Sequence, residues 1–163
     1  MATAVQVAGV TTVSVGTGAA DALETLGKSR NGVIVRKDAF WLNVPGDDNG
    51  GDDGPPIEIQ MLGEIAIVRL ELTKFDSAIL TKVAARLKGG TEGSAPATVG
   101  SLVFSNNYFY RLLLNNANDP INFLRAVPRG AYEKNRGTKY QTAVLEFECH
   151  RNDSGVLHNA VIT

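Results

Sequence analysis

The most regular pattern in this chain is an alternation of apolar and polar side chains that begins at Ile57. Between Ile57 and Met61 every second residue is apolar, and the same period resumes after Gly63 and continues to Leu72. Successive side chains of a β-strand point to opposite faces of a sheet, so a period of two indicates a strand with one buried face. The pattern predicts a long β segment over residues 57–72, interrupted near Gly63.

The stretch immediately before this segment, Asn43 to Pro56, has the opposite character. It contains four aspartates, four glycines and three prolines, and Val44 is its only bulky apolar residue. Such a composition buries too little surface to offset the entropy lost on ordering. We therefore expect a long, acidic, flexible loop over residues 43–56. Because a long loop between strands is uncommon in a compact domain, we interpret it as an arm that makes contacts.

Further segments with strand patterning lie on both sides of this region. The Asn31-Gly32 pair predicts a hairpin turn, because a type I′ turn needs positive φ at both central positions. Asn106-Asn107 predicts a turn between two paired strands. The other expected β elements are Val5–Val15, a short Leu23–Leu26 element, Val33–Val44, Leu102–Phe104, Tyr108–Leu114, Ile121–Val127, Tyr140–His150 and Leu157–Ile162, the last closing a final hairpin.

One segment changes to helical spacing. Apolar residues from Phe75 to Leu87 recur every three or four positions, which predicts the single α-helix of the chain over about residues 74–88. Thr73 and Asp76 form a capping-box-like pair at its start, and glycines at 89 and 90 would end it. With about eight strands and one helix, we expect a mainly β fold, a β-sandwich or small barrel, as a single domain over residues 1–163.

Composition narrows the class of function. The chain carries 16 basic and 17 acidic side chains, and this net charge of −1 lacks the positive field that nucleic-acid binding requires. No apolar run approaches the roughly 20 residues that cross a bilayer, and the N-terminal stretch lacks the basic region of a signal peptide. We expect no membrane partner. The single cysteine, Cys149, excludes an internal disulfide and is expected to pack in the core.

The acidic loop contains a partial calcium-binding pattern. Asp47, Asn49 and Glu58 occupy positions 1, 3 and 12 of a twelve-residue loop. The pattern breaks at Gly51, which stands at a ligand position, and at Asp52, which stands where the sharp turn requires glycine. We therefore expect no metal ligands in this loop. Weak stabilisation by millimolar calcium stays open.

Candidate catalytic groups are few. Cys149 and His150 are neighbours on an expected strand and point to opposite faces, so they cannot form a dyad. His158 has no partner that the sequence identifies, and the GxG at residues 16–18 lacks the third glycine and the helix of a phosphate-binding loop. We expect no catalytic residue, no cofactor and no enzymatic activity.

Two groups of opposite charge stand out instead. Aspartates gather in the acidic loop, and basic residues gather between residues 125 and 139. A solvated surface explains most such charge runs. The alternative is that the loop of one copy contacts the basic segment of a neighbouring copy. The candidate contact residues are Asp47, Asp48, Asp52, Asp53, Arg125, Arg129, Lys134 and Arg136.

Between residues 23 and 87 the parts follow a characteristic order. The turn GKSRNGV leads into a strand, an acidic glycine-rich loop, and then the segment PPIEIQMLGEIAIVRLELTKFD followed by a helix. This order resembles the tail tube (major tail) proteins of tailed bacteriophages. The resemblance implies a virion structural protein with a β-sandwich or barrel-like fold that self-assembles into homohexameric rings. Such rings stack into a tube for genome delivery.

The resemblance also implies binding partners and a location in the virion. The partners would be other copies of the chain and other tail proteins of the virion, with DNA only in transient passage through the lumen. The protein would be assembled in the host cytoplasm and reside in the phage tail. Acidic side chains that line a lumen would repel DNA phosphates and ease that passage.

Three alternatives remain at this stage. A capsid decoration or cement protein, or a baseplate or neck component, would share the virion but would not form tubes by itself. A calcium-dependent adhesion or ligand-binding β-domain would bind calcium specifically and lose it on changing Asp47 and Asn49. An enzyme would need a buried carboxylate pair in a deep cleft.

Overall fold

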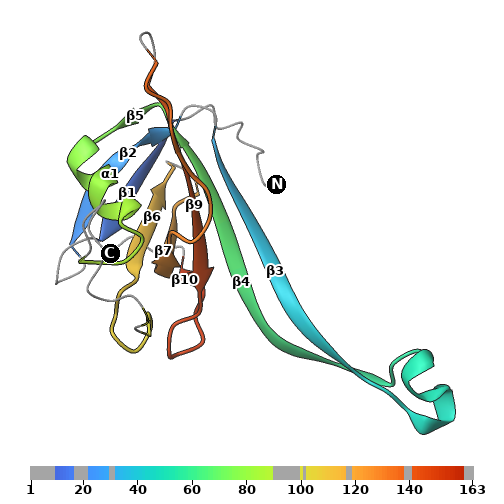
Figure 1. The fold of residues 1–163 in the computed structure, drawn as a ribbon. Coiled ribbons are helices and arrows are strands. Elements are labelled where there is room, and N and C mark those ends of the chain that lie inside the picture. Colours follow the sequence, from blue (N-terminus) through green and yellow to red (C-terminus); the bar gives the residue numbers. More distant parts are fainter. Residues whose placement is uncertain are drawn as a thin grey trace, which may run out of the picture.

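The computed structural model describes residues 10–16, 22–29, 32–89, 100, 102–116, 119–137 and 141–159 of the chain. Within these residues there are ten β-strands, one α-helix and two short 3₁₀ turns (Figure 1). The elements are β1 (Thr11–Gly16), β2 (Leu23–Ser29), β3 (Val33–Val44), η1 (Asp47–Asn49), η2 (Gly51–Asp53), β4 (Glu58–Leu72), β5 (Lys74–Phe75), α1 (Ser77–Ala84), β6 (Tyr110–Asn115), β7 (Ile121–Val127), β8 (Tyr132–Lys134), β9 (Ala143–His150) and β10 (His158–Asn159).

All strand pairings are antiparallel, and they join the strands in the order β3-β4-β9-β7-β6-β1-β2-β5. Two short strands lie off this path, with β8 on β9 and β10 on β7. Although β4 and β5 stand near opposite ends of the order, only Thr73 separates them in the chain. The Thr73 amide donates to the Lys28 carbonyl at 2.9 Å. The sheet therefore rolls until its two ends approach, without closing into a barrel.

The hydrophobic core lies inside this roll. Along β9 buried and partly buried residues alternate without a break, as expected for a strand with one face in the core. The largest fully buried side chains include Tyr110, Phe123 and Phe147. Helix α1 covers the roll with its buried residues Leu80 and Val83, on the side of β1 and β2 in Figure 1.

One part of the sheet leaves the body. The pairing of β4 with β9 stops at Ala66, whereas the pairing of β3 with β4 continues to Val44 and Glu58. Residues 38–65 therefore form a two-stranded hairpin, here called the arm, that projects well beyond the other strands (Figure 1). Its paired strands extend over about seven residues, or about 20 Å at the rise of a β-strand.

The predicted fold class is confirmed: the protein is mainly β with one helix. The helix is shorter than the expected 74–88, because Asp76 rather than Thr73 is its N-cap. The Asp76 carboxylate accepts hydrogen bonds from the amides of Ala78 and Ile79 at 2.9 and 3.1 Å. The helix ends before Arg86, whose φ of 73° is left-handed. The predicted strand over Ile121–Val127 is confirmed in full.

Three expected pairings are wrong. Strands β2 and β3 on either side of Asn31-Gly32 do not pair, because β2 pairs with β1 and β5 while β3 pairs with β4. Residues 103–107 form a turn instead of a strand paired with β6. The final strand β10 joins β7 and not β9. Of the expected first strand, residues 5–9 lie outside the described residues.

Candidate assembly surface

The arm carries most of the large apolar side chains that the described surface leaves exposed. Each of those on the arm leaves between 42% and 60% of its surface open. They are Phe40, Trp41, Leu42, Ile57, Ile59, Met61 and Leu62. Soluble monomers rarely expose apolar groups contiguously, and contiguous patches usually mark an interaction site. The arm is therefore the main candidate for a functional surface.

The register of the hairpin places these apolar groups on both of its faces. Trp41 stands opposite Met61, whereas the next residue, Leu42, stands opposite Gln60 and therefore faces the other way. A β-bulge between Phe40 and Trp41 inserts Leu62 as an extra residue. An isolated two-stranded hairpin is only marginally stable in water. Because apolar groups lie on both faces, burial against a partner would stabilise the arm.

The tip of the arm, within the expected acidic loop over 43–56, contains two short 3₁₀ turns. The two 3₁₀ turns η1 and η2 are joined at Gly50, whose φ of 93° requires glycine. The Ile57 amide donates to the Val44 carbonyl at 3.0 Å and closes the base of the tip. A Cβ on Gly46 would overlap the Ile57 Cγ2 atom, so a larger residue here would require the exposed Ile57 side chain to move.

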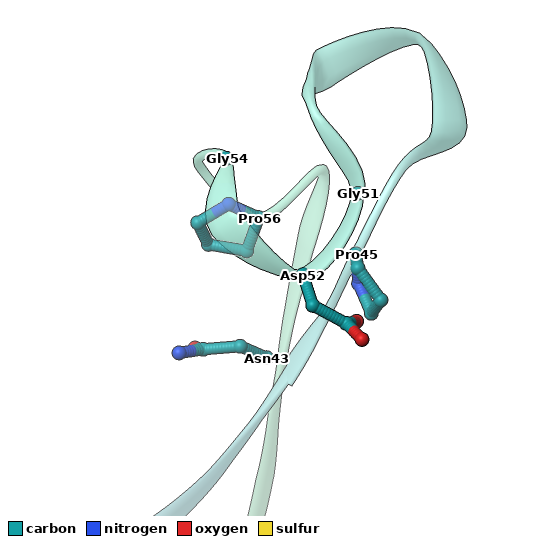
Figure 2. A pocket seen from close by; sticks show the side chains of 6 residues that line it. All are labelled: Asn43, Pro45, Gly51, Asp52, Gly54 and Pro56. Atoms are coloured by element: carbon teal, nitrogen blue, oxygen red, sulfur yellow. The ribbon is translucent and has the colours of Figure 1, made fainter.

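A shallow hollow lies within the tip, and its lining contains one acidic side chain (Figure 2). Asp52 lines it together with Asn43, Pro45 and Pro56 and the glycines at 51 and 54. Among the described residues there is no group of three histidine, cysteine, aspartate or glutamate side chains placed to hold a metal ion. Asp52 is thus the one carboxylate in this shallow hollow that could bind a cation.

The arm is strongly acidic. Residues 38–64 contain seven acidic side chains and no basic one, so all 16 basic side chains lie elsewhere in the chain. The four aspartates of the tip, at 47, 48, 52 and 53, are exposed. The molecule is therefore almost neutral overall but divided into a negative arm and a positive body.

Two of the four basic residues predicted as contacts already have partners within the body. Arg125 pairs with Asp153 at 2.8 Å and lies over the rings of Phe104 and Phe109, with 14% of its side chain exposed. Arg129 pairs with Glu148 at 2.7 Å. Both side chains therefore have intramolecular partners, which account for their charge without a second copy.

The other two predicted basic residues lie at the end of β8 and beyond it. Arg136 is exposed beyond the end of β8. Lys134 places its ammonium 5.5 Å from the centre of the Phe75 ring, near the β2–β5 edge. The structure thus divides the predicted basic segment between two regions. Two lysines that the sequence did not single out, Lys28 and Lys74, stand opposite each other in the β2–β5 pair.

The arm also has unpaired backbone. Along β3 only one edge is paired, and along residues 58–65 of β4 only the edge facing β3 is paired. Near the body, the exposed ion pair of Arg36 and Asp38 at 2.8 Å places charge on β3. Farther out, residues 39–42 carry no charge. Charged residues protect an edge from pairing, so the outer part of β3 is the less protected part.

The residues considered for catalysis are dispersed. Cys149 is fully buried, and burial followed by the charge of Glu148 raises the pKa of its thiol. His150 lies on the other face of β9, as predicted, and its Nε2 is 2.9 Å from a carboxylate oxygen of Glu148. His158 contacts the Lys37 ammonium, and burial followed by that positive charge lowers its pKa. The described residues bring no nucleophile and base together in a cleft.

Comparisons with known proteins yield a resemblance of shape and no match in sequence. No family model matches the chain, and no protein of curated function matches it. Solved structures that match include a chain from "Virion of native gene transfer agent (GTA) particle", with a TM-score of 0.47 and 9% sequence identity. The match covers 83% of this chain and 88% of that chain. Overlap and identity at this level do not establish a shared function.

No described helix is both long and apolar enough to cross a membrane.

Proposed function

We propose that this protein is a structural subunit of a phage tail tube, which assembles with copies of itself into stacked rings around a channel for genome delivery. The observation that carries the proposal is the arm. It projects two paired strands from a rolled sheet, exposes apolar side chains on both faces, and has unpaired edges. These are properties of a segment that is completed by neighbouring subunits.

The proposed role needs no cofactor and no catalytic group. Its work is done by burial of the arm, by pairing of free strand edges and by complementary charge between copies. Other virion tail proteins would contact the ends of the tube, and DNA would pass through the lumen. Acidic side chains that face a lumen would repel phosphates and keep the channel free of bound DNA.

Electron microscopy of the purified protein over a concentration series tests the proposal. Stacked rings or tubes with a central channel are the expected result. Small, uniform particles at every concentration would overturn it, and would favour a decoration protein that binds a preformed capsid lattice or a monomeric adhesion domain.

A deletion variant links the result to the arm. Removal of residues 47–54 takes away the tip and leaves the hydrophobic core untouched, because none of the described core residues lies within it. The variant should retain the circular dichroism and the unfolding midpoint of the wild type while it loses assembly. If this deletion variant is instead unfolded, the tip is required for the folding of the body.

A further inference from the structure

A second hollow lies where the two ends of the rolled sheet meet. Strands β2 and β5 form its walls, with Leu26, Lys28, Lys74 and Phe75 among the lining residues. Gly27 allows this approach, since a Cβ on it would lie 2.2 Å from the Lys74 carbonyl oxygen. The hollow therefore combines an apolar floor with basic side chains at its rim.

The basic side chains of this hollow have no acidic partner among the described residues. Lys28 stands directly opposite Lys74 in the β2–β5 pair, an arrangement of like charges that destabilises a sheet. The one acidic residue in the lining, Asp76, uses a carboxylate oxygen to cap helix α1. An acidic ligand would relieve the repulsion between these lysines.

The acidic tip of the same molecule cannot reach this hollow. The tip precedes β4 and the hollow follows it, so the 15 residues of β4 separate the two sites. At the rise of an antiparallel strand this separation is up to about 50 Å, several times the screening length of about 8 Å at physiological salt. Figure 1 shows the tip and β5 at opposite ends of the molecule. An acidic tip that reaches the hollow must therefore belong to another molecule.

We propose that the hollow at Lys28 and Lys74 receives the acidic tip of a second copy of this chain. The inference rests on the proposed function and names the surface that the arm would use. The four exposed aspartates of the tip would meet the two lysines, and the exposed Ile57 beside the tip would meet the apolar floor near Phe75. Such a contact joins unlike surfaces head to tail, and repeated contacts of this kind produce rings or open filaments.

Two charge-reversed variants of the full chain test the docking. One carries Asp47→Lys, Asp48→Lys, Asp52→Lys and Asp53→Lys in the tip, and the other carries Lys28→Glu and Lys74→Glu in the hollow. Each variant alone should need at least a tenfold higher concentration to assemble than the wild type. A mixture of the two should assemble again, because each tip then finds a hollow of opposite charge. Arg69→Glu, a charge change at an exposed position of β4 outside the hollow, should leave assembly unchanged.

Several results would overturn the docking. These are normal assembly of either folded variant alone, or failure of two folded variants to assemble when mixed. Circular dichroism and urea unfolding establish that each variant is folded. If the wild type forms no rings, the proposed function fails, and analytical ultracentrifugation of the two variants at low salt then decides the docking separately. A mixed complex that neither variant forms alone would support it, and its absence would refute it.

Discussion

Trp41 offers the sharpest test of the arm, because its side chain is large, exposed and outside the core. The change Trp41→Ser should weaken assembly strongly and leave the folded monomer almost unchanged. Trp41 leaves 58% of its surface exposed and stands opposite Met61, which is itself on the arm. Its loss therefore opens no cavity in the body, and the free energy of unfolding should change by less than about 1 kcal/mol.

The expected effect on assembly follows from the area that a partner would cover. An aromatic side chain buries about 150–250 Å², so the exposed part of Trp41 corresponds to about 130 Å². At about 25 cal/mol per Å² its burial contributes about 3 kcal/mol, or roughly a hundredfold in an association constant. The protein concentration at which polymer first appears should rise by a factor of this order.

Pelleting by ultracentrifugation across a concentration series measures this threshold, and urea unfolding measures monomer stability. Leu102→Ser is the matched control, because Leu102 is 69% exposed but lies on the body in the turn before β6. It should leave the threshold unchanged. A threshold for Trp41→Ser within twofold of the wild type, or an equal shift in the control, would refute the reasoning that the arm is the assembly surface.

Three further predictions concern salt, the helix cap and pH. Raising the salt concentration from 0.05 to 0.5 M should raise the assembly threshold, as light scattering would show, because the proposed contact joins exposed opposite charges. Asp76→Ala should lower the free energy of unfolding by about 1 kcal/mol, because two helix amides lose their acceptor, whereas Asp76→Asn should retain most of it. His158 has its pKa lowered by burial and by Lys37, so the unfolded state binds the proton first. Stability should therefore fall as the pH drops below about 6.5, and His158→Gln should flatten that part of a chemical-denaturation series.

The sequence pattern was sufficient to predict the elements whose formation depends on nearby residues. The alternation from Ile57 to Leu72 predicted β4, and the apolar alternation that ends at Cys149 predicted both the strand and its buried thiol. The helical spacing after Phe75 predicted α1. The cap was misplaced from Asp76 to Thr73 because both are good cap residues, and the short strand β5 occupies the positions between them.

Pairings between distant segments were beyond the reach of sequence patterns. Asn31-Gly32 carries a hairpin signal, yet β3 pairs with β4 because that register matches the two strands over twelve residues. The meeting of Lys28 and Lys74 depends on the rolling of the whole sheet, which no short motif encodes. The two turns of the acidic tip depend on glycines that tolerate left-handed backbone, whereas the composition argument considered only the small buried area.

The local pairing of the arm has a consequence for the order of folding. Strands β3 and β4 are neighbours in the chain, whereas β1 pairs with β6 about a hundred residues away, as in the pair Val13 and Leu114. A hairpin forms in about 1–10 μs, and pairings across long loops form far more slowly. A nascent chain should thus expose an apolar hairpin before the rest of the sheet has folded. The arm carries seven acidic side chains and no basic one, so the arms of partly folded chains would repel one another. The same charge that directs an arm to a finished body would keep immature arms apart.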